Sequence, residues 1–343
     1  MNQFVTLSAI LLFVSLQAIA QTPASAPATP HDRLVNAAQR ALLDDPDLKP
    51  WHLKLDVKVF DVNGSNPTAG TVEAWHSGKL YKTIYTFGES TRTSLHNSDG
   101  SYESHSGPET PALADAILDA FLDPGPSLQD FEGTSLDIRH QSFGKVTLDC
   151  IMLSRHMTDV DHAPMGLFPT YCLDQSGEEL RASYNFGSQS LLRNDIGNFQ
   201  GRDVSTHFSL VQGRVTVADA KVATLTTFTP TADFFLPGSS AAQFYSAYAR
   251  VSGGIIAGMR LTFVQPIYPE SAKRNRVSGT VVLHAVISRD GHIYSLFPVA
   301  GPDPDLTIAA IAAVRQWTYK PYLLNGSPTR VDTTITINFN LNR

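Results

Sequence analysis

The chain has 343 residues, a hydrophobic fraction of 42%, a charged fraction of 17% and a formal net charge of −6. This length accommodates two ordinary domains with substantial cores. The mildly acidic balance argues against a nucleic-acid partner, because phosphate binding requires a concentrated basic face.

The first twenty residues have the pattern of an export signal. Phe4 to Leu16 is an almost uninterrupted apolar run, and Ala18-Ile19-Ala20 is a small–x–small site for a leader peptidase. We therefore expect a signal peptide over residues 1–20, cleaved after Ala20, and a mature chain in the periplasm. The alternative is an uncleaved inner-membrane anchor facing the periplasm, because Met1-Asn2-Gln3 lacks the usual positive charge.

Two segments have the composition of connections. Residues 21–30 are rich in Pro and Ala, which favours an extended, solvated tether. Residues 238–254 contain Gly and Ser at both ends and are predicted to be a linker. These segments divide the mature chain into a β-rich domain over 31–237 and a C-terminal domain over 255–343.

The only two cysteines, Cys150 and Cys172, each lie in a strand-like stretch. An even count in an exported chain predicts a structural disulfide between them. Their spacing is not Cys-x-x-Cys, which argues against a redox-active pair.

The β-rich domain begins with a candidate helix, Asp32–Leu43. In the next segment apolar residues from Leu53 to Val59 alternate with polar ones, which predicts an antiparallel strand with one face toward solvent. Turn signals such as Asp99-Gly100 separate further strand-like runs. These runs cover residues 71–76, 80–87, 91–96, 136–143, 146–155, 168–173, 179–185, 204–210, 214–217 and 222–228.

A second helix interrupts the strands. Pro111 fits its first position, Leu113, Ile117 and Phe121 form an apolar stripe, and Asp123-Pro124-Gly125-Pro126 ends it. The fold class is therefore α+β, with a large curved antiparallel sheet and one or two helices lying across it.

Three short motifs follow one another in this sheet: Gly70-x-x-x-x-Trp75, Lys79-Leu80-Tyr81-Lys82 and Ser98-Asp99-Gly100-Ser101. Together with the initial helix and the alternating strand, they resemble the lipoprotein-carrier (LolA-like) half-barrel. The resemblance implies a trough that carries a lipid or a lipoprotein. The simpler interpretation of the same apolar residues is a core covered by a helix.

The C-terminal domain has a regular succession of elements. Pro269 can start a helix over Glu270–Arg276, and Gly279 precedes a strand with Val281, Leu283, Ala285 and Ile287 on its buried face. Asp290-Gly291 predicts a two-residue hairpin with a return strand over 293–299, and Asp303-Pro304 caps a second helix. A Trp317-x-Tyr319-x-Pro321 motif follows this helix. We expect Trp317 to pack the helix against the sheet and Pro321 to end the helix.

The last strand predicted is the candidate functional surface. Its apolar residues Ile335, Ile337, Phe339 and Leu341 alternate with polar ones, and residues 333–342 contain no proline or charge. Such a terminal strand is an unprotected edge unless another strand or chain pairs with it.

The Gln265-Pro266-Ile267-Tyr268-Pro269 element and the Trp317-x-Tyr319-x-Pro321 element, in this order, resemble the C-terminal domain of TonB proteins. The resemblance implies a small periplasmic β-α-β module that binds an extended peptide of an outer-membrane or periplasmic protein by strand addition. The partner-binding residues are then Gln265, Pro266, Tyr268, Thr334, Ile335, Thr336, Ile337, Asn338 and Phe339. The alternatives for the edge are a homodimer or cover by the β-rich domain.

No catalytic, cofactor or metal site is predicted. The sequence lacks Gly-x-Ser-x-Gly, P-loop and His-Glu-x-x-His motifs. His156, Asp159, Asp161 and His162 cluster in a loop, but without the helical spacing or cysteine partners typical of a zinc site.

Overall fold

The computed structural model describes residues 28–61, 64–155, 163–244 and 249–341. The predicted signal peptide, most of the tether and the His156–His162 cluster lie outside these residues. The elements in chain order are α1 (Pro30–Ala41), β1 (Trp51–Val59), β2 (Thr68–Ser77), β3 (Leu80–Phe87), β4 (Ser90–Asn97), β5 (Gly100–Ser106), α2 (Ala112–Leu122), a 3-10 turn (Leu128–Phe131), β6 (Thr134–Phe143), β7 (Val146–Arg155), β8 (Thr170–Leu173), β9 (Leu180–Tyr184), β10 (Ser190–Phe199), β11 (Arg202–Gln212), β12 (Val215–Thr227), β13 (Ala242–Phe244), β14 (Ala249–Arg250), α3 (Gly253–Gly258), β15 (Arg260–Thr262), α4 (Glu270–Arg274), β16 (Gly279–Ile287), β17 (Ile293–Ala300), α5 (Pro304–Val314), β18 (Thr318–Tyr319), β19 (Leu323–Leu324), β20 (Ser327–Pro328) and β21 (Val331–Phe339).

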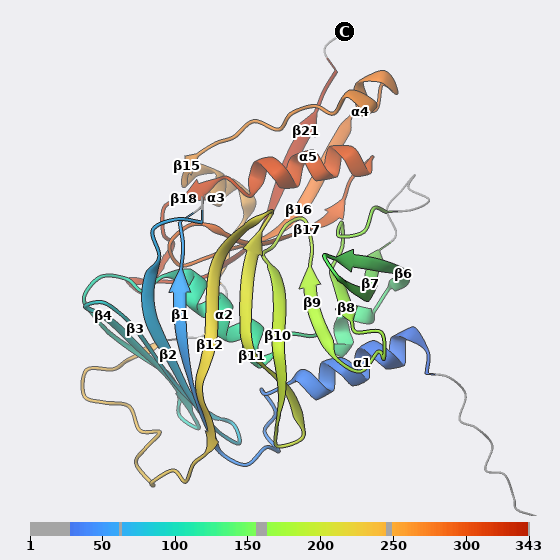
Figure 1. Ribbon diagram of the computed structural model, residues 1–343. Helices are drawn as coiled ribbons and strands as arrows, with labels where there is room; N and C mark the ends of the chain where they lie inside the picture. The colour runs from blue at the N-terminus through green and yellow to red at the C-terminus, as the bar shows by residue number, and fades with distance from the viewer. Residues whose placement is uncertain (1–27, 62–63, 156–162, 245–248, 342–343) are drawn as a thin grey trace, which may run out of the picture.

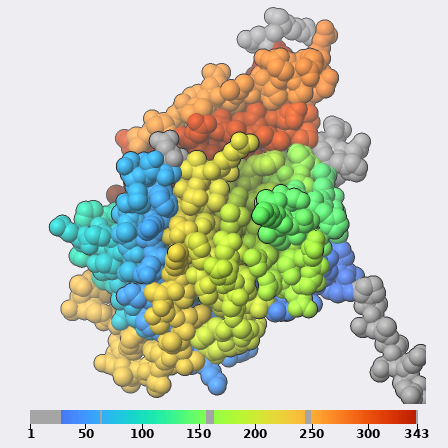
Figure 2. Space-filling model, in the orientation of Figure 1, coloured from blue at the N-terminus to red at the C-terminus, as the bar shows by residue number. Residues whose placement is uncertain are grey.

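A curved, open antiparallel sheet forms most of the molecule (Figure 1). Its order is β13-β5-β4-β3-β2-β1-β12-β11-β10-β9-β8-β7-β6, so β13 and β6 are its two edges. Helices α1 and α2 lie across one face of it, and a small second sheet with α5 sits over one end (Figures 1 and 2). The predicted α+β class, with a curved antiparallel sheet and covering helices, is confirmed.

The alternation in β1 decides which face of the sheet is buried. Trp51, Leu53 and Leu55 are fully buried, whereas His52 and Lys54 between them are partly exposed. Helix α2 covers this apolar face with the buried residues of its own stripe, Ile117, Leu118 and Phe121. Burial of each such side chain stabilises the fold by roughly 1.5–3 kcal/mol.

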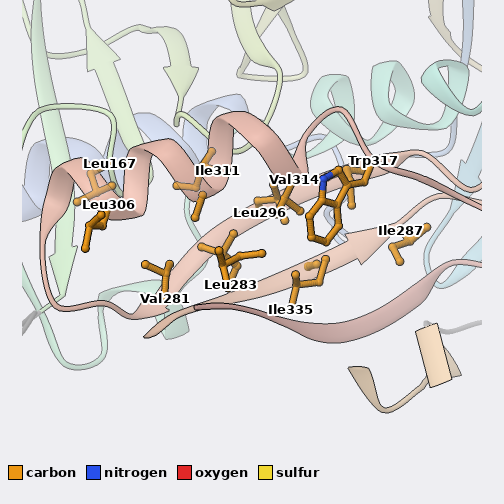
Figure 3. Packing of buried hydrophobic residues seen from close by; sticks show 14 of the residues in the cluster. Leu167, Val281, Leu283, Ile287, Leu296, Leu306, Ile311, Val314, Trp317 and Ile335 are labelled. Atoms are coloured by element: carbon orange, nitrogen blue, oxygen red, sulfur yellow. The ribbon is translucent and has the colours of Figure 1, made fainter. Parts of the chain in front are cut away.

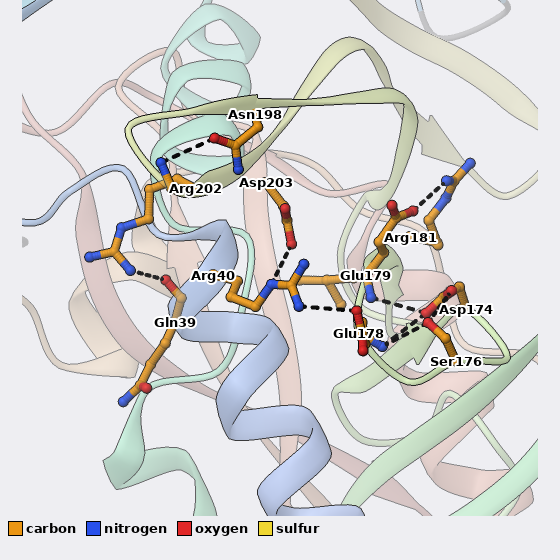
Figure 4. Close-up of polar contacts among 12 residues, drawn as sticks. Gln39, Arg40, Asp174, Ser176, Glu178, Glu179, Arg181, Asn198, Arg202 and Asp203 are labelled. Atoms are coloured by element: carbon orange, nitrogen blue, oxygen red, sulfur yellow. Dashed lines mark hydrogen bonds and ion pairs between the residues drawn. The ribbon is translucent and has the colours of Figure 1, made fainter.

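Helix α1 closes the other half of the same face. Thr29 and Asp32 form a capping box at its N-terminus. At its C-terminal end the guanidinium of Arg40 donates hydrogen bonds to Asp203 at 2.8 Å and Glu178 at 3.3 Å (Figure 4). Leu34, also on α1, is fully buried against β7, β8 and β9. Apolar packing and polar contacts therefore hold both ends of α1 to the sheet.

Several strand predictions differ from the structure, and three of the differences concern long strands of the large sheet. The runs 214–217 and 222–228 belong to one strand, β12, because its small residues still pair with β1 and β11. Strands β5 and β10 are additional. In β10 the buried Arg193 takes an inward position and donates hydrogen bonds to the carbonyl oxygens of Leu180 and Asp203. A charged residue at a buried position removes the apolar alternation from which a strand is predicted.

The predicted disulfide between Cys150 and Cys172 is present. The two residues lie directly opposite each other on β7 and β8, and both are fully buried. The bond therefore joins strands that are already paired, close to the β6 edge of the sheet.

Replacing both cysteines with alanine should lower the free energy of unfolding by roughly 3 kcal/mol, because the loop closed by the bond then becomes free in the unfolded chain. Urea unfolding under non-reducing conditions measures this. The wild-type protein in reductant serves as the control, since it should approach the stability of the double variant. Equal stability of oxidised wild type and variant would contradict a structural role.

The small sheet has the order β14-β21-β16-β17, and α5 packs on one face of it (Figure 3). Val281, Leu283, Ala285 and Ile287 of β16 are all buried, as predicted from their alternation. Asp303 caps α5 through hydrogen bonds from the backbone N–H groups of its first turn.

One predicted role in this module is wrong. Helix α5 ends at Val314, and Pro321 follows the short strand β18, so Pro321 does not end the helix. The chain turns earlier because the N–H of Tyr319 donates to the carbonyl of Gly291 at 2.8 Å. Trp317 lies just beyond the helix, 3% exposed, in the apolar cluster between α5 and the sheet.

A buried ionic cluster joins the small sheet to the large one. Asp115 on α2 accepts a hydrogen bond from Arg92 on β4, and Arg330 reaches the same carboxylate at 3.8 Å. Nearby, Arg289 donates to both carboxylate oxygens of Glu103 on β5, at 2.9 and 2.8 Å. Burial by itself raises the pKa of Asp115, but the guanidinium groups of Arg92 and Arg330 outweigh burial and hold this pKa below its usual value.

The substitution Asp115→Asn should destabilise the protein by about 3 kcal/mol, because it leaves the buried Arg92 without its closest counter-charge. The matched control is Asp119→Asn, whose side chain is 51% exposed and should lose less than about 1 kcal/mol. Urea unfolding at neutral pH measures both. Equal losses would contradict the assigned role of the buried cluster.

The same cluster predicts a pH dependence. Because the pKa of Asp115 is lowered in the folded state, its contribution is complete above the unfolded value of about 3.9. This contribution is lost as the pH falls through the folded pKa. The stability difference between wild type and Asp115→Asn should therefore be constant near neutral pH and shrink under acid. A difference that stays constant down to the most acidic pH of the titration would contradict this.

Candidate functional site

Strand β21 has one fully paired side and one partly covered side. It pairs antiparallel with β16 from Val331 to Phe339. On the other side, β14 pairs only with Val331 and Asp332, and the hydroxyl of Thr333 donates to the carbonyl of Val251 at 2.7 Å. The chain segment 249–253 thus covers only the first part of this edge.

Gly253 ends the covered part. A Cβ atom at this position would lie 2.2 Å from the carbonyl oxygen of Thr334, so only glycine allows the two backbones to approach this closely. Next to it, a Cβ at Gly254 would meet no atom within 4 Å.

The remainder of the edge is open. Asp332 uses its carbonyl toward the segment 249–253, and in an antiparallel ladder every second residue directs its main-chain groups the same way. The N–H and C=O groups of Thr336 and Asn338 therefore point away from β16. Within residues 28–61, 64–155, 163–244 and 249–341 no strand pairs with this part of β21.

A groove of about 320 Å³ lies along the open edge. One wall consists of the end of β21 from Thr336 to Phe339 together with Asn340, and the other wall is the extended segment that carries Gln265, Pro266 and Tyr268. The groove brings together seven of the nine residues predicted to bind a partner: Gln265, Pro266, Tyr268, Thr336, Ile337, Asn338 and Phe339. The other two lie outside it, since Thr334 is beneath Gly253 and Ile335 is buried in the core.

Internal hydrogen bonds fix the second wall. The indole N–H of Trp317 donates to the carbonyl of Val264 at 2.8 Å, and the hydroxyl of Tyr268 donates to the carbonyl of Val277 at 2.5 Å. The ring of Tyr268 also meets Phe339 edge to face, with centroids 5.4 Å apart. The polar atoms of both aromatic residues are thus used internally, and apolar ring surface lines the groove.

The remaining motif residues shape the ends of these elements. Pro269 is the N-cap of α4, and Gly279 begins β16 opposite Phe339. Asp290 and Gly291 lie in the connection 288–292 between β16 and β17, so the predicted two-residue hairpin is wrong: the N–H of Ser288 donates to the carbonyl of His292 at 2.8 Å and closes a longer loop. Buried Tyr319 pairs with Arg260 between β18 and β15, and burial raises the pKa of this phenol to about 12.

The sequence patterns did not identify Arg260 and Phe263 as groove residues. Both come before the Gln-Pro-x-Tyr-Pro element, in a stretch without strand periodicity. The guanidinium of Arg260 lies over the rings of Phe263 and Trp317, at 4.4 and 4.5 Å from their centroids. Contact with Trp317, which lies far along the chain, places Arg260 at the groove.

The substitution Gly253→Ala should destabilise the protein by about 1–3 kcal/mol, because the new methyl group forces the segment 249–253 away from Thr334. The matched control Gly254→Ala, which meets open space, should be neutral or slightly stabilising. Urea unfolding distinguishes them. Similar effects for both variants would contradict the close contact at Gly253.

A second, larger cavity of about 530 Å³ lies between α2, strands β9 to β11 and the small sheet. Its lining includes Asp44, Asp119, Asp123, Tyr294 and Arg330. Burial, together with nearby Asp44, raises the pKa of Asp123. Apolar side chains such as Leu122, Leu191 and Leu210 share this lining, so the cavity is mixed and lacks the continuous apolar surface that acyl chains require.

Within the described part of the chain, no group of three or more His, Cys, Asp or Glu side chains is placed to hold a metal ion. Likewise, no helix in these residues has both the length and the apolar character needed to cross a membrane.

Comparison with curated proteins gave no match. Three solved structures are similar to the chain over 60–62% of its length. They are a LolA superfamily protein from Nitrosomonas europaea (9% identity, 99% of that chain, TM-score 0.38), a DUF1329 family protein from Desulfovibrio piger (7%, 98%, 0.38) and a putative outer membrane lipoprotein-sorting protein domain from Vibrio parahaemolyticus (11%, 97%, 0.36).

The C-terminal module matches a family model. The match covers residues 264–341, from the residue that accepts the Trp317 hydrogen bond to two residues beyond the last strand. It confirms the resemblance predicted from the two motifs in this part of the chain. Residues 264–341 are thus similar to the family described as Gram-negative bacterial TonB protein C-terminal.

Proposed function

We propose that this is an exported, periplasmic binding protein whose C-terminal module engages an extended peptide segment of an outer-membrane or periplasmic protein by β-strand addition. The open half of β21 is the observation that carries the proposal. An exposed edge with unpaired main-chain groups is a template for another strand.

The groove supports the same function. A strand added at Thr336 and Asn338 would lie between β21 and the wall formed by Gln265, Pro266 and Tyr268. Main-chain hydrogen bonds would supply affinity, and the ring surfaces of the groove would select side chains. The chemistry needs no cofactor and no catalytic residue, and we propose none.

An adaptor role fits this chain better than energy transduction. In the TonB family, transduction implies an inner-membrane anchor and a long periplasmic spacer. In this sequence the short tether over residues 21–30 joins a predicted cleavable export signal to the proposed β-rich domain over 31–237. N-terminal sequencing of the exported protein tests this proposal: a first residue of Gln21 supports the adaptor, and retention of residues 1–20 supports an anchored transducer.

Two alternatives make different predictions. A lipid or lipoprotein carrier should copurify with lipid, although α2 covers the apolar face of the sheet and the cavity beside it includes three carboxylates in its lining. A homodimer through residues 333–341 should show twice the monomer mass in light scattering. Mass spectrometry of the purified protein and light scattering test them directly.

The substitution Thr336→Pro should weaken binding of extended peptides by about tenfold, because it removes an outward N–H and places a ring at the open edge. The matched control Thr336→Val keeps the N–H and the β-branched shape, so it should bind like wild type. Fluorescence polarisation with a library of random nine-residue peptides and the full chain measures both. Folding of the proline variant is checked by its urea unfolding curve, since this N–H takes no part in the ladder with β16.

Binding that survives Thr336→Pro would contradict strand addition. So would equal losses in the proline and valine variants, because a shared loss would come from the hydroxyl and not from the main chain.

A further inference from the structure

The groove contains one charged side chain. Of the residues that line it, Arg260 carries a positive charge, and none is Asp or Glu. Among the described residues no carboxylate forms an ion pair with Arg260. This is unusual in a chain with a net charge of −6, where acidic side chains outnumber basic ones.

The guanidinium of Arg260 contacts two aromatic rings. The guanidinium carbon lies 4.4 Å from the ring centroid of Phe263 and 4.5 Å from that of Trp317, which are cation–π contacts. Such contacts do not consume the N–H donors of a guanidinium, which match the two oxygens of a carboxylate. The aromatic rings therefore place Arg260 at the groove while its hydrogen-bond donors stay available for a ligand.

The surroundings favour an ion pair that is partly shielded from water. Phe263, whose ring contacts the guanidinium, is 55% exposed, so apolar ring surface lies beside the charge at the groove. A bound peptide that covers this ring would lower the local dielectric and strengthen a charge pair at Arg260.

We infer that the segment bound in this groove carries an acidic side chain, Asp or Glu, which pairs with Arg260 while its main chain adds to β21. This inference rests on the proposed strand-addition function and names the chemistry of the partner. The carboxylate belongs to a side chain within an extended segment. A free chain terminus is usually captured by several backbone N–H groups, whereas here a single side-chain fork is available.

The test uses the full chain and blocked synthetic nine-residue peptides in which Val and Thr alternate. One series carries a single Glu at each position in turn, a second carries Gln at the same positions, and a third carries Lys. A fourth set lacks Glu but has a free C-terminal carboxylate. Fluorescence polarisation gives the dissociation constants for wild type, Arg260→Gln, Arg260→Glu and Thr336→Pro.

The best Glu peptide should bind wild type about tenfold more tightly than its Gln counterpart, as expected for one charge-assisted hydrogen-bonded pair. Arg260→Gln should remove this preference, and Arg260→Glu should transfer it to the Lys peptide. A gain of binding to Lys cannot come from misfolding, so it keeps the test decisive. The preference should also shrink as the salt concentration rises.

Failure of this inference is distinguishable from failure of the proposed function. Equal binding of the Glu and Gln peptides, abolished by Thr336→Pro, would overturn the acidic preference and leave strand addition standing. Tightest binding by the set with a free C-terminus would overturn the side-chain source. Absence of binding in all four sets would overturn strand addition and with it the inference.

Discussion

The main-chain hydrogen bonds of β21 constrain the whole C-terminal module. Every residue from Val331 to Phe339 pairs with β16, which fixes the apolar face of β21 against α5. The same pairing leaves every second N–H and C=O directed away from the sheet. Since buried polar groups of the backbone require partners, this side must be covered, solvated or bound. The chain covers the first part and leaves the rest beside a groove.

The cover belongs to the connection between the two sheets. The chain leaves the large sheet at β13, which pairs with β5, and reaches β21 at β14. Glu103 on β5 also receives the two hydrogen bonds from Arg289. Contacts at β5 and at the Asp115 cluster therefore hold the small sheet in place, and a further close approach occurs at Gly187, where a Cβ would lie 2.0 Å from the carbonyl oxygen of Leu296.

Sequence patterns predicted the local part of this structure because they depend on neighbouring residues. Apolar alternation identified β1, β16 and β21, and Asp303-Pro304 identified the start of α5. Strand β10 was not predicted, because Arg193 occupies a buried position in it. Hydrogen bonds to the carbonyl groups of Leu180 and Asp203, on two other strands, stabilise the buried charge. The cover at Gly253 and the position of Arg260 were missed for a similar reason, since both depend on contacts with residues about sixty or more positions away.

The aromatic residues of the family motif determine the width of the groove. Tyr268 packs on Phe339, at the end of β21, and its hydroxyl donates a hydrogen bond to the carbonyl of Val277. Trp317 holds the start of the motif segment through Val264. An extended segment tied at these two points runs beside the strand edge and does not pair with it, which keeps a space between them. The aromatic residues Tyr268 and Trp317 thus act as spacers, and the edge stays open because they hold the neighbouring chain away from it.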